Sequence, residues 1–519
     1  MGERGNGGAP RGGGRAGGSG ASGGGRGGGH GAGRGGGNAG GRGGSRPGGG
    51  SGGSGREGRG GRGGAGGSRS GRPSRPVRDE ARNAAYDLLR AVDERDAYAN
   101  LLMPALLRER GLSGRDAGLA TELAYGTLRG LGTYDEVIAA CSDRAPHDLD
   151  PPLLDALRLG AHQLLKTRVP PHAAVGTTVD LVRLRVGAGP AKYANAVLRK
   201  VATRSLEQWL PIVAPDPAGD PVGHLAVAHS HPRWVVTALR DAVGGDLAET
   251  AALLAADNER PRVTLVARPG RCSVAELLDA GAAPADFSPY AAYLPEGDPG
   301  TVPAVAQGRA AVQDEASQLV ALALTRVPVE GGDSRWLDMC AGPGGKAGLL
   351  DALAVQESAR LLAAELQHHR ARLVRQAVGE AAVVTADGRV PAWRPGVFDR
   401  VMLDAPCTGL GALRRRPEAR WRRDPASLPE LGAVQRDLLG SALDAARPGG
   451  VVAYVTCSPH LAETAVVVGD VLRRRDDAEV LDARAYLPEA EGLGEGPYAQ
   501  FWPHRHGTDA MFLALLRRR

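Results

Sequence analysis

Cysteine is scarce in this sequence, and the few cysteines present do not form a structural framework. Among 519 residues there are five: Cys141, Cys272, Cys340, Cys407 and Cys457. Their number is odd, and their spacing fits neither a disulfide scaffold nor a zinc site. We therefore expect no structural disulfide and no metal, and a reducing cytoplasm fits this pattern.

Long apolar runs are also missing. No uninterrupted apolar stretch is long enough to span a membrane, and the first residues lack the apolar core of a signal peptide. We therefore expect a cytoplasmic protein with no membrane partner. The length of 519 residues exceeds that of one ordinary domain and predicts two to four folded units.

Lysine is rare and positive charge is unevenly distributed. The 64 basic residues include only four lysines, at positions 166, 192, 200 and 346. The formal net charge is +6, but residues 1–75 hold 13 arginines and two acids, a net +11, which leaves −5 (6 − 11) for the rest. Any nucleic-acid surface on the remaining 444 residues must therefore be a local patch.

The first 75 residues have an unusual composition. They contain 39 of the 78 glycines and almost no apolar side chain beyond alanine. Such a segment cannot bury enough surface to offset the entropy lost on ordering, which predicts a disordered Gly/Arg-rich tail at 1–75. Its arginines could hold RNA loosely through phosphates, or the tail could simply be solvated and keep the chain in solution.

Periodicity divides the remaining chain into three parts. Residues 76–205 show apolar positions at helical spacing, punctuated by Gly and Pro, which predicts an all-α domain. Residues 206–305 mix helical patterns with a strand-like run and predict a small α+β connecting domain. From 306 to 519, apolar runs alternate with helical stretches, which predicts an α/β Rossmann-like domain whose parallel sheet has helices on both faces. The runs are 335–340, 360–366, 381–387, 399–406 and 450–457.

The ends of these runs carry a candidate cofactor site. The first run leads into a Gly-rich loop, where the backbone can approach a ligand closely. The next three end in acids, at the strand ends where open α/β sheets bind ligands. The loop matches neither phosphate-binding glycine motif, and carboxylates would repel a polyphosphate. These carboxylates suit a nucleoside with a positive sulfonium, as in S-adenosylmethionine. The residues are Cys340, Ala341, Gly342, Pro343, Gly344, Gly345 and Lys346, with Glu365, Asp387 and Asp404.

Each of these charged residues also has a simpler interpretation. An acid at a strand end is often a helix cap or a solvated loop residue. Lys346 is the only lysine after residue 200. It could pair with an acid at the start of a helix, or it could be a compact cation near the methionine end of the cofactor or the reacting base.

Two cysteines follow buried runs, in LDAPCTGLG (403–411) and VTCSP (455–459). Methyl transfer to oxygen or to an exocyclic nitrogen needs no thiol. Carbon 5 of a pyrimidine is a poor nucleophile until a thiolate adds to carbon 6, so a thiolate beside the cofactor indicates covalent catalysis. An acid at the ring nitrogen would stabilise the adduct. Chemistry alone leaves open whether Cys407 or Cys457 attacks, and either could be a small buried hydrophobe.

The motifs LDMCAGPGGK, LDAPCTGLGALRRRPEARWR and YVTCSP, in this order, resemble the RNA cytosine-5 methyltransferases of the Nol/Nop/Sun family. The helical part resembles the NusB-like RNA-binding domain of the bacterial Sun (Fmu) type, which acts on 16S rRNA. The resemblance covers about 78–519. It implies a class I methyltransferase domain, S-adenosyl-L-methionine as cofactor, and 16S rRNA or an early small-subunit particle as partner of a monomer.

The resemblance also implies roles for individual residues. Cys457 would be the nucleophile, and Cys407 would assist release of the adduct with removal of the proton from carbon 5. Asp404 would hold the edge of the base and lie beside the cofactor. The sequence departs from the family pattern at Ala347, Thr408, Ala510 and Met511. These departures affect packing and fine positioning, and none removes a group with an assigned role.

An arginine-rich stretch, RRRPEARWRR (414–423), follows the Cys407 motif. Arginine binds phosphate through two hydrogen bonds and stacks on bases, and a target cytosine must leave its stack to react. We therefore predict an RNA-guiding role here, with a solvated basic surface as the alternative. The predicted contacts are Arg414, Arg415, Arg416, Arg420, Trp421 and Arg422.

Other functions remain open from the sequence. The same chemistry would serve a tRNA or 23S rRNA cytosine-5 methyltransferase. A catalytically silent NusB-like RNA-binding assembly factor is a second alternative, against which the intact set of Cys407, Cys457, Asp404 and Lys346 argues. For methylation of a protein or a small molecule, the cysteine pair would have no purpose.

Overall fold

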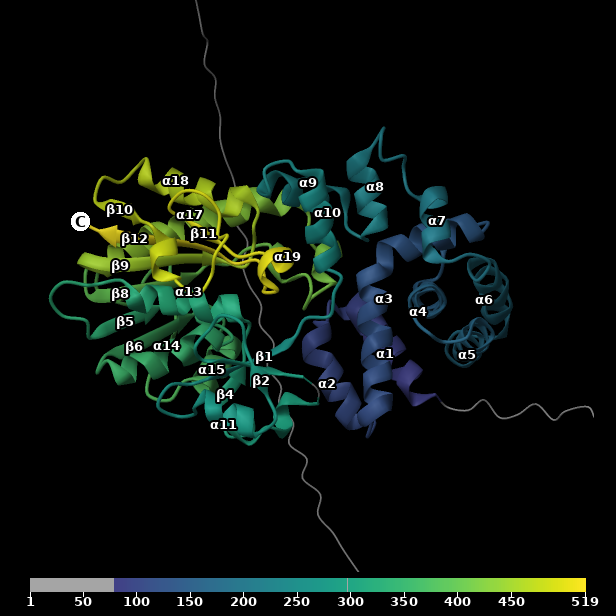
Figure 1. Cartoon of the computed structure of the whole chain (residues 1–519), viewed down its shortest axis with the longest axis horizontal. Helices are drawn as coiled ribbons and strands as arrows, with labels where there is room; N and C mark the ends of the chain where they lie inside the picture. Colours follow the sequence, from purple (N-terminus) through teal and green to yellow (C-terminus); the bar gives the residue numbers. More distant parts are fainter. Residues whose placement is uncertain (1–78, 296) are drawn as a thin grey trace, which may run out of the picture. The chain divides into compact units, whose positions relative to one another are not determined.

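The computed structural model describes residues 79–295 and 297–519 (Figure 1). The tail predicted for 1–75 lies outside the described residues. In the described part, a helical domain comes first, a connecting region follows, and an α/β domain completes the chain. The predicted order of fold classes is confirmed.

The helical domain is built from amphipathic helices around one core. Asp79 caps the first helix by accepting a hydrogen bond from the Arg82 backbone N–H at 3.0 Å. Leu88, Leu123 and Leu157, each fully buried, are part of the core. The helices are α1 Glu80–Arg95, α2 Ala99–Glu109, α3 Gly114–Cys141, α4 Pro151–Lys166, α5 Pro171–Arg185 and α6 Ala188–Val201.

The connecting region has two separate cores, whereas the sequence analysis predicted one α+β unit. Its helices α7 Leu206–Val213, α8 Pro221–Ala228, α9 Arg233–Ala242 and α10 Leu247–Ala256 come first. Helices α8 to α10 pack against Leu410, Leu413 and Trp502 of the α/β domain. These partners lie far along the chain, so local periodicity could not reveal them.

A small antiparallel sheet with its own core follows these helices. Its strand order is β2-β3-β1-β4, and β4 lies beyond the domain boundary predicted at residue 305. Strand β4 has three residues, which are too few to show the alternation of apolar and polar residues that predicts a strand. The elements are β1 Val263–Ala267, α11 Val274–Asp279, β2 Ala283–Pro284, β3 Ala291–Leu294, α12 Pro303–Ala306 and β4 Ala310–Val312.

The α/β domain contains a mixed sheet with the order β10-β12-β9-β8-β5-β6-β7. Strands β5 to β9 are parallel and coincide with the five predicted runs. The prediction of a parallel sheet needs one correction, because β10, β11 and β12 pair antiparallel. A parallel strand needs a long crossover connection, and only short elements separate β10, β11 and β12. The strands are β5 Arg335–Asp338, β6 Arg360–Glu365, β7 Ala382–Thr385, β8 Phe398–Asp404, β9 Ala446–Thr456, β10 Ala478–Leu481, β11 Ala499–Gln500 and β12 Phe512–Arg518.

Helices cover both faces of this sheet (Figure 1). Along β9, Val451, Ala453 and Val455 pack into the core that includes α13, α14 and α15. The alternate residues Val452 and Tyr454 pack into the core that includes α17 and α18. With both faces buried, the loops at the carboxyl ends of the parallel strands are the place for a ligand site. The helices are α13 Glu315–Arg326, α14 Gly345–Gln356, α15 His368–Ala377, α17 Leu428–Ala445 and α18 Ala465–Leu472.

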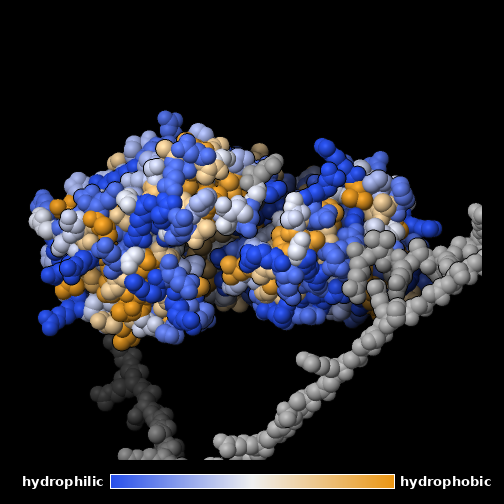
Figure 2. Space-filling view, turned by 90° about the horizontal axis from the view of Figure 1, so that it is seen from below, coloured by the Kyte–Doolittle hydropathy of each residue, from blue (hydrophilic) through white to orange (hydrophobic). Residues whose placement is uncertain are grey.

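The surface is mixed in character. On the face shown in Figure 2, hydrophilic residues surround small hydrophobic patches, as is normal for a globular protein. Among the described residues, none of the helices combines the length and the apolar character that crossing a bilayer requires.

Candidate active site

Two neighbouring strands bring Cys407 and Cys457 together. Strands β8 and β9 run in parallel, with Asp404 opposite Val455 in the register. Each cysteine lies just beyond this pair, and the two Sγ atoms are 3.4 Å apart, within hydrogen-bond distance for sulfur. The proximity follows directly from the topology, because parallel neighbours end at the same edge of a sheet.

The two thiols have opposite acidities. The hydrogen bond from Cys407, with help from the nearby Lys346 ammonium, lowers the pKa of the Cys457 thiol in spite of burial and the Asp404 carboxylate. The same hydrogen bond, together with burial, raises the pKa of Cys407 well above its ordinary value. The pair therefore favours a thiolate at Cys457 and a protonated thiol at Cys407.

Lys346 and Asp404 form an ion pair beside these sulfurs. The Lys346 Nζ atom is 2.9 Å from Asp404 Oδ2. Burial opposes the charge on Lys346, but the Asp404 carboxylate outweighs it and raises the pKa of the ammonium. Lys346 therefore pairs with an acid at the end of a strand and not at the start of a helix, and its charge also favours a thiolate at Cys457.

This geometry predicts the effect of Lys346→Met. The Cys457 thiolate would lose a neighbouring cation and face an unpaired Asp404 carboxylate, and both changes raise the pKa of Cys457. The rate of Cys457 alkylation by iodoacetamide, followed by peptide mass spectrometry, should reach its half-maximum at a higher pH than in the wild type. Asp404→Asn is the matched variant and should shift the profile to lower pH. An unchanged profile in both variants would contradict this electrostatic account.

The Gly-rich loop lies over the ends of β5 and β6. The Gly342 N–H donates to Glu365 Oε2 at 3.0 Å, and the Gln367 N–H donates to Glu365 Oε1 at 2.9 Å. A Cβ atom at Gly342 would lie 2.1 Å from Glu365 Oε2, so a larger residue there would displace the Glu365 side chain from its hydrogen bond to the loop. At the end of β5, both oxygens of buried Asp338 lack a partner, and burial raises the pKa of this carboxyl to about 8.

The remaining predicted cofactor residues differ in exposure. Asp387, just past β7, is partly exposed and pairs with Arg389 at 2.7 Å, which lowers its pKa. Burial raises the pKa of the Cys340 thiol, so this loop cysteine stays protonated. In residues 79–295 and 297–519, no group of three or more His, Cys, Asp or Glu side chains is placed to hold a metal ion.

Gly411 is a site residue that the sequence analysis missed. Its N–H donates to the Cys457 carbonyl at 2.8 Å, and its own carbonyl accepts from the Ala510 N–H at 2.8 Å. A Cβ atom at this position would lie 2.0 Å from the Ala510 oxygen. The only signals in the sequence were a glycine four residues after Cys407 and the unusual Ala510. Neither reveals a contact between three distant segments.

Much of the arginine-rich segment is buried. Arg420 is 0% exposed and donates to the Ser230 carbonyl at 3.0 Å and to Asn258 Oδ1 at 2.8 Å. Arg414 donates to the Gly507 carbonyl at 2.8 Å, and Arg415 pairs with Asp314 and Asp509. Arg422 donates to the carbonyls of Val92 and Ala97. Of the predicted RNA contacts, Arg416 and Trp421 are the exposed ones.

The buried contacts predict that Arg420→Ala lowers stability. The substitution would leave the Ser230 carbonyl and the Asn258 side chain without a donor inside the protein. We expect a loss of about 3 kcal/mol in the free energy of unfolding, since unsatisfied buried polar groups are costly. Chemical denaturation measures this, and Arg416→Ala serves as the control, with an expected change within about 0.5 kcal/mol. Equal effects of the two substitutions would contradict a structural role for Arg420.

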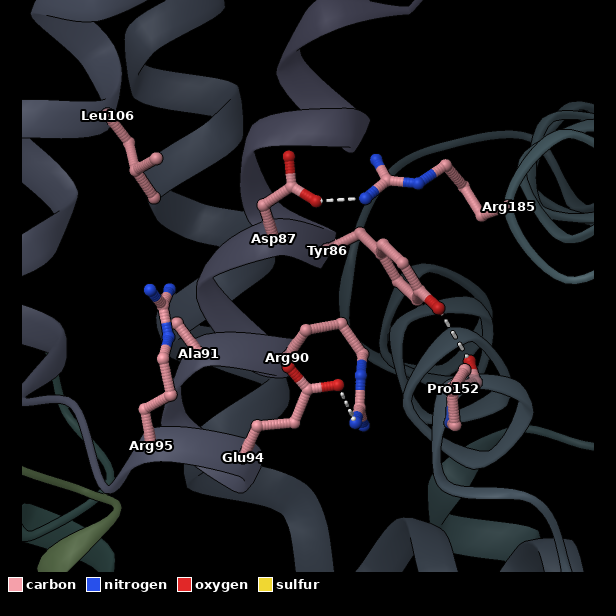
Figure 3. A pocket seen from close by; sticks show the side chains of 9 residues that line it. All are labelled: Tyr86, Asp87, Arg90, Ala91, Glu94, Arg95, Leu106, Pro152 and Arg185. Carbon is pink, nitrogen blue, oxygen red and sulfur yellow. Dashed lines mark hydrogen bonds and ion pairs between the residues drawn. The ribbon is translucent and has the colours of Figure 1, made fainter.

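A pocket in the helical domain, with a volume of about 430 Å³, also contains arginines (Figure 3). These side chains are largely paired with acids. Arg185 pairs with Asp87, and Arg90 with Glu94 at 2.7 Å. Tyr86 donates to the Pro152 carbonyl at 2.9 Å. The pocket is therefore nearly balanced in charge and does not form a concentrated cationic site.

Comparisons with known proteins agree with this architecture. Residues 320–517 match the family described as 16S rRNA methyltransferase RsmB/F, and residues 79–203 match the NusB family. A putative methyltransferase of Mycobacterium tuberculosis is 55% identical over 444 residues, which cover 85% of this chain and 97% of the relative. Ribosomal RNA small subunit methyltransferase B of Pseudomonas putida is 32% identical over 84% of this chain and 98% of its own.

The fold has a counterpart among solved structures. The crystal structure of PH0851 superposes with a TM-score of 0.70 at 22% identity, covering 85% of this chain and 99% of that one. The predicted resemblance is confirmed for both domains. The chain belongs to the 16S rRNA methyltransferase RsmB/F family, and it carries its NusB family domain ahead of the methyltransferase domain.

Proposed function

We propose that this protein transfers a methyl group from S-adenosyl-L-methionine to carbon 5 of one cytosine in 16S rRNA, through a transient bond between Cys457 and carbon 6. The observation that carries the proposal is the 3.4 Å separation of the Cys407 and Cys457 sulfurs at neighbouring strand ends. A second thiol at this distance has no purpose in other methyl transfers. The relatives named ribosomal RNA small subunit methyltransferase B support 16S rRNA as the substrate.

The residues around the Gly-rich loop fit this cofactor. The two unpartnered oxygens of buried Asp338 leave acceptor capacity beneath the loop, and the missing side chain of Gly342 lets the backbone lie against Glu365. The strand-end carboxylates suit a sulfonium and ribose hydroxyls. The cofactor would be held by the loop 340–346, together with Glu365, Asp387 and Asp404. When bound, it supplies a methyl group as an electrophile.

The first chemical task falls to Cys457. Its thiolate lone pair forms a bond to carbon 6, and the electrons of the C5–C6 double bond move onto carbon 5, which becomes nucleophilic. Asp404 lies at the next strand end and would hold the polar edge of the base. Lys346 keeps Asp404 in place through their 2.9 Å ion pair and favours the thiolate before attack.

Release of the product is assigned to Cys407. After methylation, Cys407 in its thiolate form takes the proton from carbon 5, and the C–H electrons re-form the C5–C6 double bond. The bond between carbon 6 and Cys457 breaks, and Cys457 leaves as a thiolate. The proton that Cys407 carried at the start passes to water, so each turnover releases one proton. Once Cys457 is bonded to carbon 6 it is no longer a thiolate, so the interaction with Cys457 that raises the pKa of Cys407 is removed. Cys407 can then lose its proton before it acts as the base.

The exposed part of the arginine-rich segment would guide the RNA. Arg416 is exposed, and its charge adds to the hydrogen bond from Cys407 and to Lys346 in lowering the pKa of Cys457. Trp421 is 37% exposed. A guanidinium can bind a phosphate and an indole can stack on a splayed base. The target cytosine has to leave its stack to reach Cys457.

Bisulfite sequencing of cellular RNA tests the proposal. Cells that lack this protein should lose one 5-methylcytosine in 16S rRNA, and a wild-type copy should restore it. Loss of a methylcytosine in tRNA or 23S rRNA would refute the substrate assignment. No lost methylcytosine, together with no transfer of label from S-adenosylmethionine to RNA, would favour a catalytically silent RNA-binding assembly factor.

A further inference from the structure

A buried carboxylate connects the two cysteine loops. Glu463 ends the short helix η5, Leu461–Glu463, and is 0% exposed. Its Oε1 atom accepts from the Thr408 N–H at 2.7 Å, and its Oε2 atom accepts from the Thr408 hydroxyl at 2.5 Å and the Ser458 hydroxyl at 2.6 Å. Thr408 directly follows Cys407, and Ser458 directly follows Cys457. One side chain therefore binds the residue next to each sulfur.

Further buried contacts fix the position of Glu463. Its backbone carbonyl accepts from the Tyr454 hydroxyl of β9 at 2.8 Å. Gln435 of α17 donates to Glu463 Oε1 at 3.3 Å and to the Pro406 carbonyl at 2.9 Å. Pro406 immediately precedes Cys407. The carboxylate is thus anchored from a strand and a helix, and it cannot shift without breaking several buried hydrogen bonds.

We propose that Glu463 is a positioning residue that clamps the Cys407 loop to the Cys457 loop, so that both sulfurs face one pyrimidine ring. The functional meaning of the clamp rests on the proposed covalent mechanism. Glu463 touches neither the RNA nor the cofactor in this account. It acts through Thr408 and Ser458.

The contacts of Glu463 suit a carboxylate. Burying an ionised group is costly unless it is hydrogen-bonded, and here donors approach both oxygens. Only a carboxylate accepts from the present donors at both oxygens, because the NH2 group of an amide at the Oε2 position would have to donate to the two hydroxyls and reverse those hydrogen bonds. The charge also has an effect on the thiols. It adds to the hydrogen bond that Cys407 donates to Cys457 and to burial in raising the pKa of Cys407.

The charged groups around the two thiols make a selective test possible. Asp404 acts on both thiols, while Lys346 and Arg416 act on Cys457. Glu463→Gln changes none of these three side chains. It removes the negative charge that favours a protonated Cys407, so the pKa of Cys407 should fall toward that of Cys457. The preference for a thiolate at Cys457 should weaken as a result.

The experiment compares Glu463→Gln with the wild type in two measurements. In methyl transfer to 16S rRNA, we expect kcat to fall by about 10²-fold with KM for RNA unchanged, because the sulfurs lose their alignment. In iodoacetamide labelling read by peptide mass spectrometry, the ratio of modified Cys457 to modified Cys407 should fall. A wild-type kcat and a wild-type labelling ratio in a folded variant would overturn the proposal.

Control variants separate positioning from general destabilisation. Glu315 is 1% exposed and accepts from the Phe287 and Ser288 N–H groups at 2.8 and 2.9 Å. Glu315→Gln therefore also disturbs a buried, hydrogen-bonded carboxylate, but it should leave the cysteine labelling ratio unchanged. Thermal unfolding is recorded for every variant. A lower labelling ratio in Glu315→Gln would refute a specific role for Glu463.

If Glu463→Gln does not fold, two milder variants test whether Glu463 clamps the two cysteine loops. Ser458→Ala and Thr408→Val each remove one hydroxyl donor and keep the charge of Glu463. Each should lower kcat by about 10-fold while the order of thiol labelling is retained, and wild-type kcat in both would overturn the clamp. If the wild type itself transfers no methyl group to RNA, the proposed function fails, and the labelling ratio still tests the clamp.

Discussion

Replacing Cys457 with serine is expected to lower the rate of methyl transfer to 16S rRNA by about 10⁴-fold or more, because the step that activates carbon 5 would be lost. A serine hydroxyl ionises far above neutral pH, and the Lys346 ammonium that favours a thiolate cannot offset this difference. The measurement is transfer of labelled methyl from S-adenosylmethionine. Binding of the cofactor alone should be nearly unchanged, since Cys457 is not among the residues proposed to hold it.

A second cysteine provides the control for this substitution. Cys272 is buried beside the small antiparallel sheet, and its sulfur contacts the Ser273 carbonyl at 3.3 Å. Cys272→Ser makes the same chemical change at a thiol with no proposed role. It should retain methyl transfer close to the wild-type rate. If Cys457→Ser were as active as Cys272→Ser, another residue would have to be the nucleophile.

The substitution Cys407→Ala should have a different consequence. Carbon 5 would be methylated, but no base would take its proton, so the bond between Cys457 and carbon 6 would persist. We expect turnover to fall by about 10³-fold, within the range for loss of a general base. A covalent complex of the protein with methylated natural RNA, formed without any base analogue, should accumulate and be visible on a denaturing gel.

The loss of Cys407 also affects the first step. Its hydrogen bond is the main cause of the lowered pKa of Cys457, so the pKa of Cys457 should rise in Cys407→Ala. Complex formation should therefore be slow near neutral pH and become faster as the pH is raised and the thiolate forms. Wild-type turnover in this variant, or turnover lost with no complex at any pH, would contradict the assigned role.

The sequence predicted the central sheet and the position of both cysteines after strands. Each apolar run of the α/β domain became a strand, and each candidate residue at its end lies at the carboxyl edge. The reason is that the periodicity of apolar residues and the order of the strands can be read directly from the sequence. In a parallel sheet, neighbouring strands end at the same edge, so the residues that follow them lie close together. Asp404 and Val455 are opposite each other because β8 and β9 are neighbours.

Contacts between distant segments were not predictable in the same way. The arginine-rich segment looked like an open cationic surface, yet Arg420 is fully buried and hydrogen-bonded to carbonyl groups of the connecting region. The sequence indicated no role for Glu463 or Gly411. Their partners are 55 and about 100 residues away in the chain. No local pattern encodes such pairings.

The most direct test of the central claim is to identify the residue that bonds to the base. 16S rRNA transcribed with 5-fluorocytidine in place of cytidine carries fluorine at carbon 5, so the final proton removal is blocked. Incubation with the wild-type protein and S-adenosylmethionine should give a stable complex. Peptide mass spectrometry should then find the methylated fluorocytosine on Cys457. Attachment at Cys407, or methylation of natural RNA without any trapped complex, would contradict the account.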